Sequence, residues 1–246
     1  VLKLNAPDVL NALSGEMVRE LSVAVSEATH TEQVRCLLLT GVGRGFCAGA
    51  NLQGSASSES AEPAGSVLET HYAPLMNKLR NLPFPMVTAV NGVAAGVGMS
   101  LALVGDIVIA AESAYFLQAF VNIGLVPDGG ATWVLPKAAG IPAAMEAMLL
   151  GERILAERAY ELGMVNRCVE DEALMDEARA LAERLANGPT VAMGQIRRLV
   201  RNAQSQSLSD AMNAEAEAQR IAGNSEDFVE GVQAFLGKRE AAFKGR

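Results

Sequence analysis

Residues 86–101 read MVTAVNGVAAGVGMSL, and this stretch decides the fold. Its first five residues form an apolar run with three β-branched side chains, a turn with three glycines follows, and an apolar helical pattern comes next. A short continuous apolar run is typical of a strand covered on both faces, and glycines after it let the chain turn sharply into a helix. The stretch therefore predicts a strand, a turn and a helix of an α/β protein.

The same pattern extends outward over the first part of the chain. Apolar runs at residues 34–40 and 106–110 predict two further strands, and helical patterns lie at residues 16–29 and 66–81. A proline inside the second helical pattern is expected to kink that helix. Residues 53–64, which read QGSASSESAEPA, predict an exposed loop.

Beyond residue 142 the pattern becomes almost wholly helical, with one short strand expected at residues 165–169. The expected helices lie at residues 143–150, 156–162, 172–186, 190–204, 208–222 and 227–243. A Gly-Pro pair at residues 188–189 separates two of them. We therefore expect a core over residues 1–187 and a C-terminal helical region over residues 188–246.

Composition limits the classes of partner. The chain has 246 residues, half of them hydrophobic, which is enough for a sizeable core. Its formal net charge of −8 argues against a nucleic-acid partner, because such proteins carry a basic face. Residues 87–104 are strongly apolar, but several glycines interrupt them and Asp106 follows, so we expect a buried strand and helix and no membrane span.

Cysteine and histidine usage argues against a metal site. The three cysteines, Cys36, Cys47 and Cys168, form no CxxC pair, and neither of the two histidines has a companion at ligand spacing. This pattern predicts neither a disulfide framework nor a metal centre. Reduced thiols, together with the lack of a recognisable targeting segment, favour a cytoplasmic location.

Two glycine-rich turns are candidates for anion binding. Residues 41–52 read GVGRGFCAGANL and residues 91–101 read NGVAAGVGMSL, and each turn follows a predicted strand. Backbone N–H groups exposed in two such turns can converge on one oxygen as an oxyanion hole, where losing one donor typically costs about 3–4 kcal/mol of transition-state stabilisation. The alternative is that the glycines only allow tight packing of a helix on a strand.

A third motif, GLVPDGGAT at residues 124–132, places Asp128 in a strong turn signature. One interpretation is a turn aspartate that bonds to its own backbone. The other is a carboxyl group in apolar surroundings, which would raise its pKa toward the range that proton transfer needs. The apolar residues near it in the sequence are Phe116, Phe120, Leu125 and Trp133.

These motifs, in this order, resemble the crotonase superfamily, also called the enoyl-CoA hydratase/isomerase family. The resemblance extends from residues 5–13 (NAPDVLNAL), through residues 43–52 and 91–116, to residues 235–245 (FLGKREAAFKG). It implies a crotonase-like spiral of ββα units followed by a C-terminal helical trimerisation region. It also implies an acyl-CoA substrate, no cofactor beyond the coenzyme A of that substrate, and a homotrimer or a dimer of trimers.

The resemblance assigns the chemistry residue by residue. The N–H groups of Ala50 and Val97 are the expected oxyanion donors. Ser100 and Phe120 stand where the hydratases of the family carry two water-holding glutamates. Asp128 stands where the isomerases carry their single acid/base, and its surroundings are most similar to the ring-epoxide isomerases of phenylacetate degradation, whose members also convert 3-enoyl-CoA to 2-enoyl-CoA.

Substrate contacts also follow from the resemblance. Arg44 and Lys238 match basic positions that approach the coenzyme A phosphates, the latter from a neighbouring subunit or from the C-terminal helix, although both could equally be solvated surface cations. The other residues expected at the substrate are Ala48, Asn51, Leu52, Gly96, Gly98 and Phe120. His71 and Tyr72 could line the acyl pocket or simply belong to a helix.

The prediction is therefore an enoyl-CoA isomerase with one aspartate base. Two alternatives stay open at this point. One is an enoyl-CoA hydratase or another reaction of the family on an acyl-CoA. The other is a non-catalytic acyl-CoA-binding protein that kept the fold and lost the acids.

Overall fold

The computed structural model describes residues 1–51 and 64–246. The loop expected at residues 53–64 falls outside the described residues except for Ala64, and so does Leu52. None of the described helices is both long and apolar enough to cross a bilayer, and the apolar stretch over residues 87–104 forms two strands and a helix instead.

The strands form two sheets, a large one that is wholly parallel and a small one. The large sheet has the order β1 (Leu2–Leu4), β2 (Leu37–Gly41), β4 (Met86–Val90), β6 (Ile107–Ala111) and β9 (Arg167–Val169). The small sheet has the order β3 (Gly45–Cys47), β5 (Val93–Ala95), β7 (Tyr115–Leu117) and β8 (Arg153–Leu155), the last pair being antiparallel.

From β2 to β7, successive strands alternate between the two sheets, which makes this part of the chain a spiral. Each of the pairs β2–β3, β4–β5 and β6–β7 places its first strand in the large sheet and its second in the small one. Every residue of β4 is buried, because helices cover both faces of a parallel sheet of this kind. The α/β class and the spiral of strand pairs expected from the sequence are confirmed.

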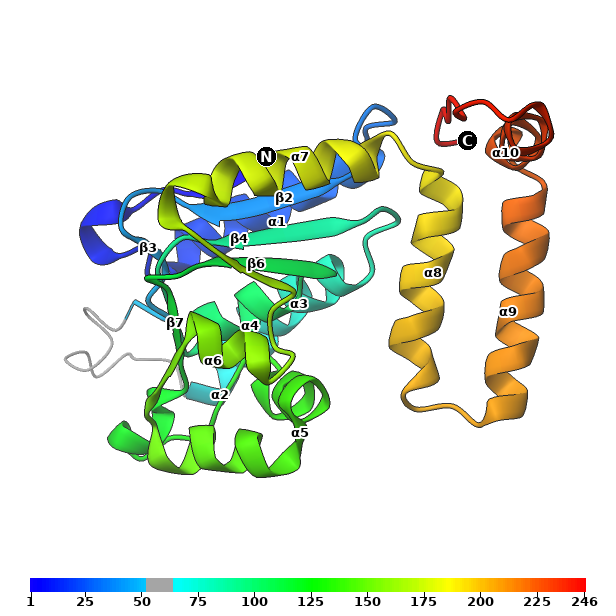
Figure 1. Cartoon of the computed structure of the whole chain (residues 1–246). Helices are drawn as coiled ribbons and strands as arrows, with labels where there is room; N and C mark the ends of the chain where they lie inside the picture. Colours follow the sequence, from blue (N-terminus) through cyan, green and yellow to red (C-terminus); the bar gives the residue numbers. More distant parts are fainter. Residues whose placement is uncertain (52–63) are drawn as a thin grey trace.

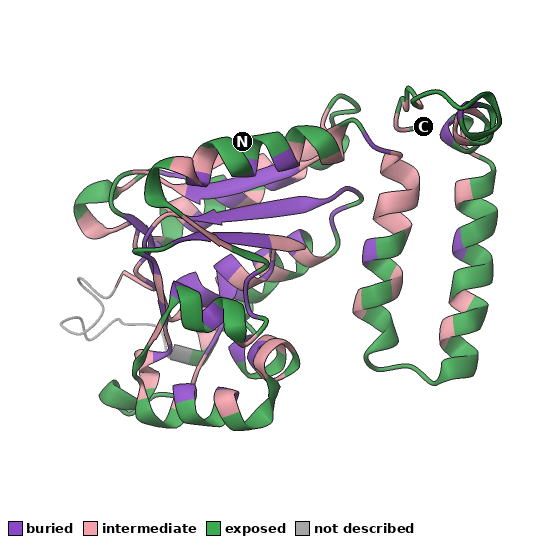
Figure 2. Cartoon of the chain, viewed as in Figure 1, coloured by how far each residue is buried: buried purple, intermediate pink, exposed green. Residues whose placement is uncertain are grey.

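The helices before residue 187 pack on the sheets, and the last three helices lie beside them. Helix α7 crosses β2, β4 and β6, and α8–α10 stand beside the core (Figure 1). The helices are α1 (Gly15–His30), α2 (Ala64–Val67), α3 (Ala73–Arg80), α4 (Val97–Leu103), α5 (Ala131–Leu150), α6 (Ala156–Glu161), α7 (Leu174–Ala186), α8 (Thr190–Ala203), α9 (Leu208–Gly223) and α10 (Glu226–Gly237). Burial is concentrated in β2, β4 and β6 of the large sheet, whereas α8 is mostly half-buried and α9 and α10 are mostly exposed (Figure 2).

Prolines and glycines change two of the expected helices. The helical segment expected at residues 66–81 is present without a break in the chain direction. It is not regular, however, because a π-helical turn, Leu68–Tyr72, lies just before Pro74. Pro74 has no N–H to donate to the carbonyl four residues earlier, so the turn before it widens. Helix α5 begins at Ala131 rather than at residue 143, and it is two helical segments joined at Gly140, whose φ is +80°.

The last helix is shorter than expected. Helix α10 ends at Gly237, not at residue 243, and Lys238 adopts a left-handed conformation with a φ of +51°. The tail then folds back, because the carboxylate of Asp227 accepts the N–H groups of Lys244 at 2.6 Å and Gly245 at 2.8 Å. Local periodicity could not predict this end, since it depends on a contact with the start of the same helix.

A buried ion cluster attaches α8 to the core. Asp106 accepts the N–H of Met86, at the start of β4, and the guanidinium groups of Arg197 and Arg201 on α8. Only 6% of the Arg197 side chain is exposed, and it also donates to the carbonyl of Leu82. The cluster therefore joins the first residue of a central strand to the C-terminal helical region.

We expect Asp106→Asn to lower the free energy of unfolding by about 3 kcal/mol, because it leaves the buried Arg197 without its counter-charge. Glu217→Gln is the matched control, since Glu217 forms an exposed ion pair with Arg220 within α9, and such pairs contribute about 0.5 kcal/mol. Denaturant unfolding of the two variants measures the difference. Equal losses would contradict the anchoring role of Asp106.

Candidate active site

The two glycine-rich turns meet at one edge of the small sheet. The first turn leaves β3 and the second leaves β5, and these strands are adjacent and parallel, with Cys47 paired to Ala94. Because the carboxyl ends of neighbouring parallel strands share an edge, the turns emerge side by side. The two glycine-rich motifs, which are separate in the sequence, are therefore neighbours in the fold.

Two glycines allow this contact. A Cβ on Gly98 would lie 2.3 Å from the carbonyl oxygen of Cys47, a distance that no side chain tolerates. A Cβ on Gly49 would lie 3.0 Å from the carbonyl oxygen of Ala95, and the φ of Gly49 is +102°. The glycines serve tight packing, as the alternative interpretation held, and that packing is what brings the two turns together.

The N–H groups of Ala50 and Val97 are directed away from the backbone ladder. Ala50 forms a parallel bridge with Leu13, in which Leu13 donates to Gly49 and accepts from Asn51, so the N–H of Ala50 points to the other side. Val97 is the first residue of α4, where an N–H has no partner within the helix. Neither N–H has an acceptor among the turn, loop and cap hydrogen bonds of the described residues.

Two side-chain amides hold these turns in shape, that of the half-buried Asn91 and that of the buried Asn11. Asn91 accepts the N–H of Gly41 at 3.1 Å and donates to the carbonyl of Gly43 at 2.8 Å, so a residue of the second turn fixes the first. Asn11 donates to the carbonyls of Val42 and Gly45 from the N-terminal segment. The sequence analysis did not single out these amides, although an asparagine directly after a buried strand was a usable signal.

Asp128 lies close to the start of α4. A Cβ on the next residue, Gly129, would lie 3.0 Å from Cγ2 of Val97 and from Cβ of Ser100. Asp128 is 9% exposed, and its Oδ1 has no hydrogen-bond partner within the described part of the chain. Burial raises its pKa from 3.8 to about 6. The aspartate is thus both a turn residue and a buried carboxyl group, and its Oδ1 is not used to stabilise the turn.

Ser100 and Phe120 both lie near the start of α4. The hydroxyl of Ser100 donates to the backbone carbonyl of Asp128 at 3.0 Å in the interior. The ring of Phe120 lies against Gly96, where a Cβ on the glycine would be 3.2 Å from its edge. Neither side chain can ionise near neutral pH, so at these two positions no group is available to activate water.

Tyr72, whose role was open, is a buried neighbour of this site. Burial raises its pKa to about 12, and the charges of Asp128 and then Cys47 add to the effect, which places Tyr72 within electrostatic range of Asp128. His71 is half-buried and bonds instead to the hydroxyl of Thr70 at 2.7 Å. Burial also raises the pKa of the Cys47 thiol to about 12, so it is not a thiolate nucleophile at neutral pH.

A pocket of about 520 Å³ opens beside the first turn. It brings together several residues that the sequence placed at the substrate: Arg44, Ala48, Ala50 and Asn51. Gly96 and Gly98 lie at the start of α4. They approach the first turn, where Gly96 is close to Gly49 and Gly98 is close to Cys47. Lys238 does not join them, because it follows α10 at the opposite end of the molecule from β3 (Figure 1).

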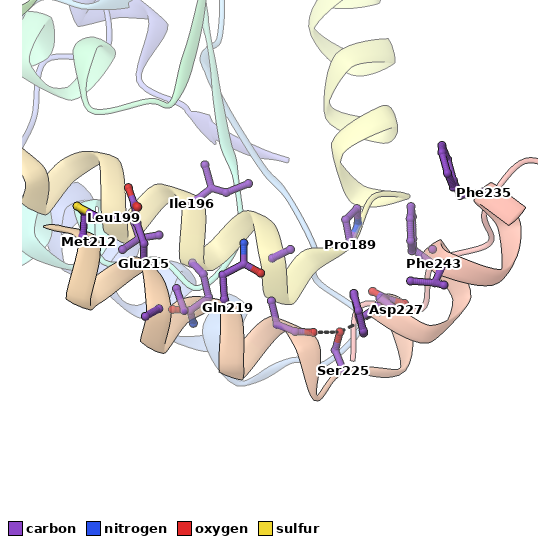
Figure 3. Close-up of a pocket in the computed structure, with 18 of the residues that line it drawn as sticks. Pro189, Ile196, Leu199, Met212, Glu215, Gln219, Ser225, Asp227, Phe235 and Phe243 are labelled. Atoms are coloured by element: carbon purple, nitrogen blue, oxygen red, sulfur yellow. Dashed lines mark hydrogen bonds between the residues drawn. The ribbon is translucent and has the colours of Figure 1, made fainter.

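A larger hollow, about 790 Å³, lies between α8, α9 and α10 (Figure 3). Its walls are mainly apolar, and they contain Ile196, Leu199 and Phe243. It contains neither of the expected oxyanion donors and not Asp128, so it is separate from the candidate active site. Over the described residues, no group of three or more His, Cys, Asp or Glu side chains could hold a metal ion.

Comparisons with known proteins agree on one family. The family model described as enoyl-CoA hydratase/isomerase matches residues 1–246. The chain is 46% identical over 251 residues to the 1,2-epoxyphenylacetyl-CoA isomerase of Escherichia coli strain K12, covering 100% of this chain and 94% of that protein. It is 42% identical over 247 residues to a probable enoyl-CoA hydratase of Rhodobacter capsulatus, with coverage of 100% and 94%.

Solved structures show the same fold. The enoyl-CoA hydratase subunit I of Geobacillus kaustophilus HTA426 superposes with a TM-score of 0.92 at 39% identity, covering 99% of this chain and 93% of that one. An enoyl-CoA hydratase from Polaromonas sp. JS666 gives a TM-score of 0.90 at 34% identity, with coverage of 98% and 94%.

We expect Gly98→Ala to disrupt the site, because the added methyl group would push α4 away from the carbonyl of Cys47. The free energy of unfolding should fall by about 3 kcal/mol, as for an overpacked core position. Gly223→Ala is the control, since a Cβ on Gly223 meets nothing within 4 Å. Thermal unfolding compares the two variants, and a Gly98→Ala protein as stable as the control would contradict the close approach.

The raised pKa of Asp128 predicts a pH-dependent stability. Below pH 3.8 the carboxyl group is protonated in both states, and its burial costs nothing extra. As the pH rises toward about 6, the unfolded chain ionises first, so folding stability is lost, by at most about 3 kcal/mol. Asp128→Asn should therefore raise the melting temperature at pH 8 by several degrees and change it little at pH 4. An equal effect at both pH values would contradict this assignment.

Proposed function

The chain belongs to the enoyl-CoA hydratase/isomerase family, and from this premise we propose that it is an isomerase that moves a double bond in an acyl-CoA thioester. The observation that carries the proposal is the carboxyl group of Asp128, which is buried beside the start of α4. By the resemblance to the family, Ser100 and Phe120 stand where the hydratases carry their two glutamates. One base without a water-holding pair fits a proton shuttle better than hydration.

The proposed reaction moves one proton and one double bond. Asp128 accepts a proton from C2 of a 3-enoyl thioester, and the C2–H electron pair moves into a dienolate whose negative charge lies on the thioester oxygen. The N–H groups of Ala50 and Val97 stabilise this oxygen, in the manner of preorganised oxyanion donors. The protonated Asp128 then returns the proton to C4, and the 2-enoyl thioester forms with no net gain or loss of atoms.

The electrostatics of Asp128 suit both halves of this cycle. A pKa of about 6 leaves the carboxylate mostly ionised at neutral pH, so it can act as a base. The same value makes its conjugate acid a ready proton donor, since general catalysis is most effective when the pKa lies near the working pH. An exposed aspartate, with a pKa near 4, would be a weaker base, and its conjugate acid would lose the proton to solvent before it could reach C4.

The substrate proposed is a 3-enoyl-CoA or a ring-epoxide acyl-CoA. The Escherichia coli relative is named an isomerase of 1,2-epoxyphenylacetyl-CoA, and the chain covers nearly all of that protein. Either a related ring epoxide or a 3-enoyl-CoA would place its thioester oxygen at the two turns and its reacting carbons toward Asp128. Tyr72 and Phe120 would then supply aromatic walls on the acyl side.

Coenzyme A is proposed to lie in the pocket beside Arg44, with the guanidinium near its phosphates. Lys238 lies too far away within one chain, so its contribution would have to come from a neighbouring copy (Figure 1). We propose that residues 188–246 form the contacts of a homotrimer. The exposed apolar side chains of this region support it, including Leu208 at 78% and Phe235 at 83% exposure. The three free cysteines fit a cytoplasmic setting.

We expect Asp128→Asn to lower the rate of conversion of a 3-enoyl-CoA to the conjugated 2-enoyl-CoA by about 10²–10⁴-fold, because the amide cannot accept the C2 proton. The ultraviolet absorbance of the conjugated thioester follows the reaction. Asp210→Asn, on exposed α9, is the control and should keep the activity of the unmodified protein.

Two outcomes would contradict the proposed isomerase mechanism. Near-normal turnover by Asp128→Asn would remove Asp128 as the base. Formation of a 3-hydroxyacyl-CoA from a 2-enoyl-CoA at a comparable rate would favour a hydratase, which is the activity in the name of the Rhodobacter capsulatus relative.

A further inference from the structure

Ser100 connects the first turn of α4 to the residue that bears the carboxylate. It is 1% exposed and lies three residues after Val97, so both residues belong to one helical turn. Its hydroxyl donates to the backbone carbonyl of Asp128 at 3.0 Å, across a sequence separation of 28 residues. The bond is buried, so no solvent competes for it.

The bond is not redundant with the bonds of the turn itself. The carbonyl of Asp128 also accepts the N–H of Ala131 at 3.0 Å, but Ala131 belongs to the same turn and would move with it. The carboxylate has no anchor of its own at Oδ1, which lacks a partner among the described residues. The direction of the carboxylate is therefore set by the backbone of Asp128, and Ser100 holds that backbone against a different element.

Packing supports the same connection. Gly129 has a φ of +58°, and a Cβ there would lie 3.0 Å from both Val97 Cγ2 and Ser100 Cβ. The turn after Asp128 thus lies directly on the face of α4 formed by these two side chains. A rigid helical turn carries the Val97 N–H on its backbone and the Ser100 hydroxyl on its side, which fixes the spacing between them.

We propose that Ser100 is a positioning residue, which sets the carboxylate of Asp128 relative to the oxyanion donor of Val97. The proposal rests on the proposed isomerase function and deepens it. In an isomerase, one carboxylate must reach two carbons, C2 and C4, so its position matters twice in each turnover. Ser100, which by the resemblance stands in place of a hydratase glutamate, would thus hold the backbone of Asp128, the proposed acid/base.

The test compares Ser100→Ala with a matched control, Thr40→Val. Thr40 is also a buried hydroxyl that donates to a backbone carbonyl of another element, Ala89 at 2.9 Å in the large sheet, with Asn91 Oδ1 as a more distant acceptor at 3.5 Å, whereas the Asp128 turn packs on α4. Both variants lose one such bond, so both should lose similar stability. Only Ser100→Ala should lower kcat, by roughly 10–100-fold with KM within about twofold, because displacement of a catalytic group by about 1 Å has effects of this size.

A second readout separates positioning from stability. In deuterated water, deuterium enters C2 of the 3-enoyl-CoA when Asp128 removes the C2 proton, exchanges it with solvent and returns a deuteron to C2, whereas product formation requires transfer to C4. A displaced carboxylate should lose transfer to C4 more than removal from C2, so the ratio of exchange to product should rise in Ser100→Ala and stay unchanged in Thr40→Val. Ser100→Cys, which keeps a weak donor of similar size, should give intermediate values.

The outcomes distinguish this inference from the function on which it rests. If Asp128→Asn abolishes isomerisation while Ser100→Ala keeps the normal kcat and exchange ratio, Ser100 has no positioning role and the isomerase assignment stands. Equal losses of activity in Ser100→Ala and Thr40→Val would likewise overturn the proposal, since the effect would then be one of stability. If Asp128→Asn remains active, the proposed function itself fails.

Discussion

The candidate site depends on the approach of α4 to the strand β3. Gly98 lies so close to the carbonyl of Cys47 that a single added carbon would overlap it. This contact decides where α4 begins, and the start of α4 decides the direction of the Val97 N–H. The Asp128 turn then packs on the same helical turn through Gly129. Thus one close approach between backbones fixes the positions of the Ala50 and Val97 N–H groups, which are the proposed oxyanion donors, and, through α4, the position of Asp128, the proposed base.

The surroundings of Asp128 lower the stability of the folded chain when the carboxyl group is ionised, and they raise its pKa. A carboxyl group that is buried without a hydrogen bond at Oδ1 is costly when ionised, and this cost is what raises its pKa to about 6. The carboxylate of Asp106 is in the opposite environment, because it accepts hydrogen bonds from Arg197, Arg201 and the N–H of Met86. The two aspartates therefore differ in their environment: the carboxylate of Asp106 is paired with two guanidinium groups, whereas Oδ1 of Asp128 lacks a partner among the described residues.

The sequence predicted the large sheet well and the small sheet poorly, for a physical reason. Strands β2, β4 and β6 have five residues each, and their continuous apolar runs carry a clear signal. Strands of the small sheet, such as β3 and β5, have only three residues and lie within the glycine-rich motifs themselves. No periodicity can be measured over so short a length, so their pairing was visible only through the resemblance to a family.

The site could be predicted as far as it depends on local motifs. Ala50, Val97 and Asp128 came from recognisable turns, and the structure brings those turns to α4. The contacts that cross between elements could not be predicted. Periodicity contains no information that the hydroxyl of Ser100 meets the carbonyl of Asp128, or that Asn91 holds the turn at Gly41, because each depends on the final packing.

The nature of the oxyanion donors explains how one frame can serve hydration and isomerisation within a family. Backbone N–H groups do not change when side chains are substituted, so the thioester site survives as long as the glycine contacts survive. In the proposed isomerase, Ser100 and Phe120 stand in place of two water-holding acids, which removes polar groups from the acyl side without changing the backbone at Ala50 or Val97. The carboxyl group of Asp128 is then the proposed base. The choice of reaction would depend on which carboxylate is kept and on what holds it, and in this chain the hydroxyl of Ser100 on α4 bonds to the backbone of Asp128.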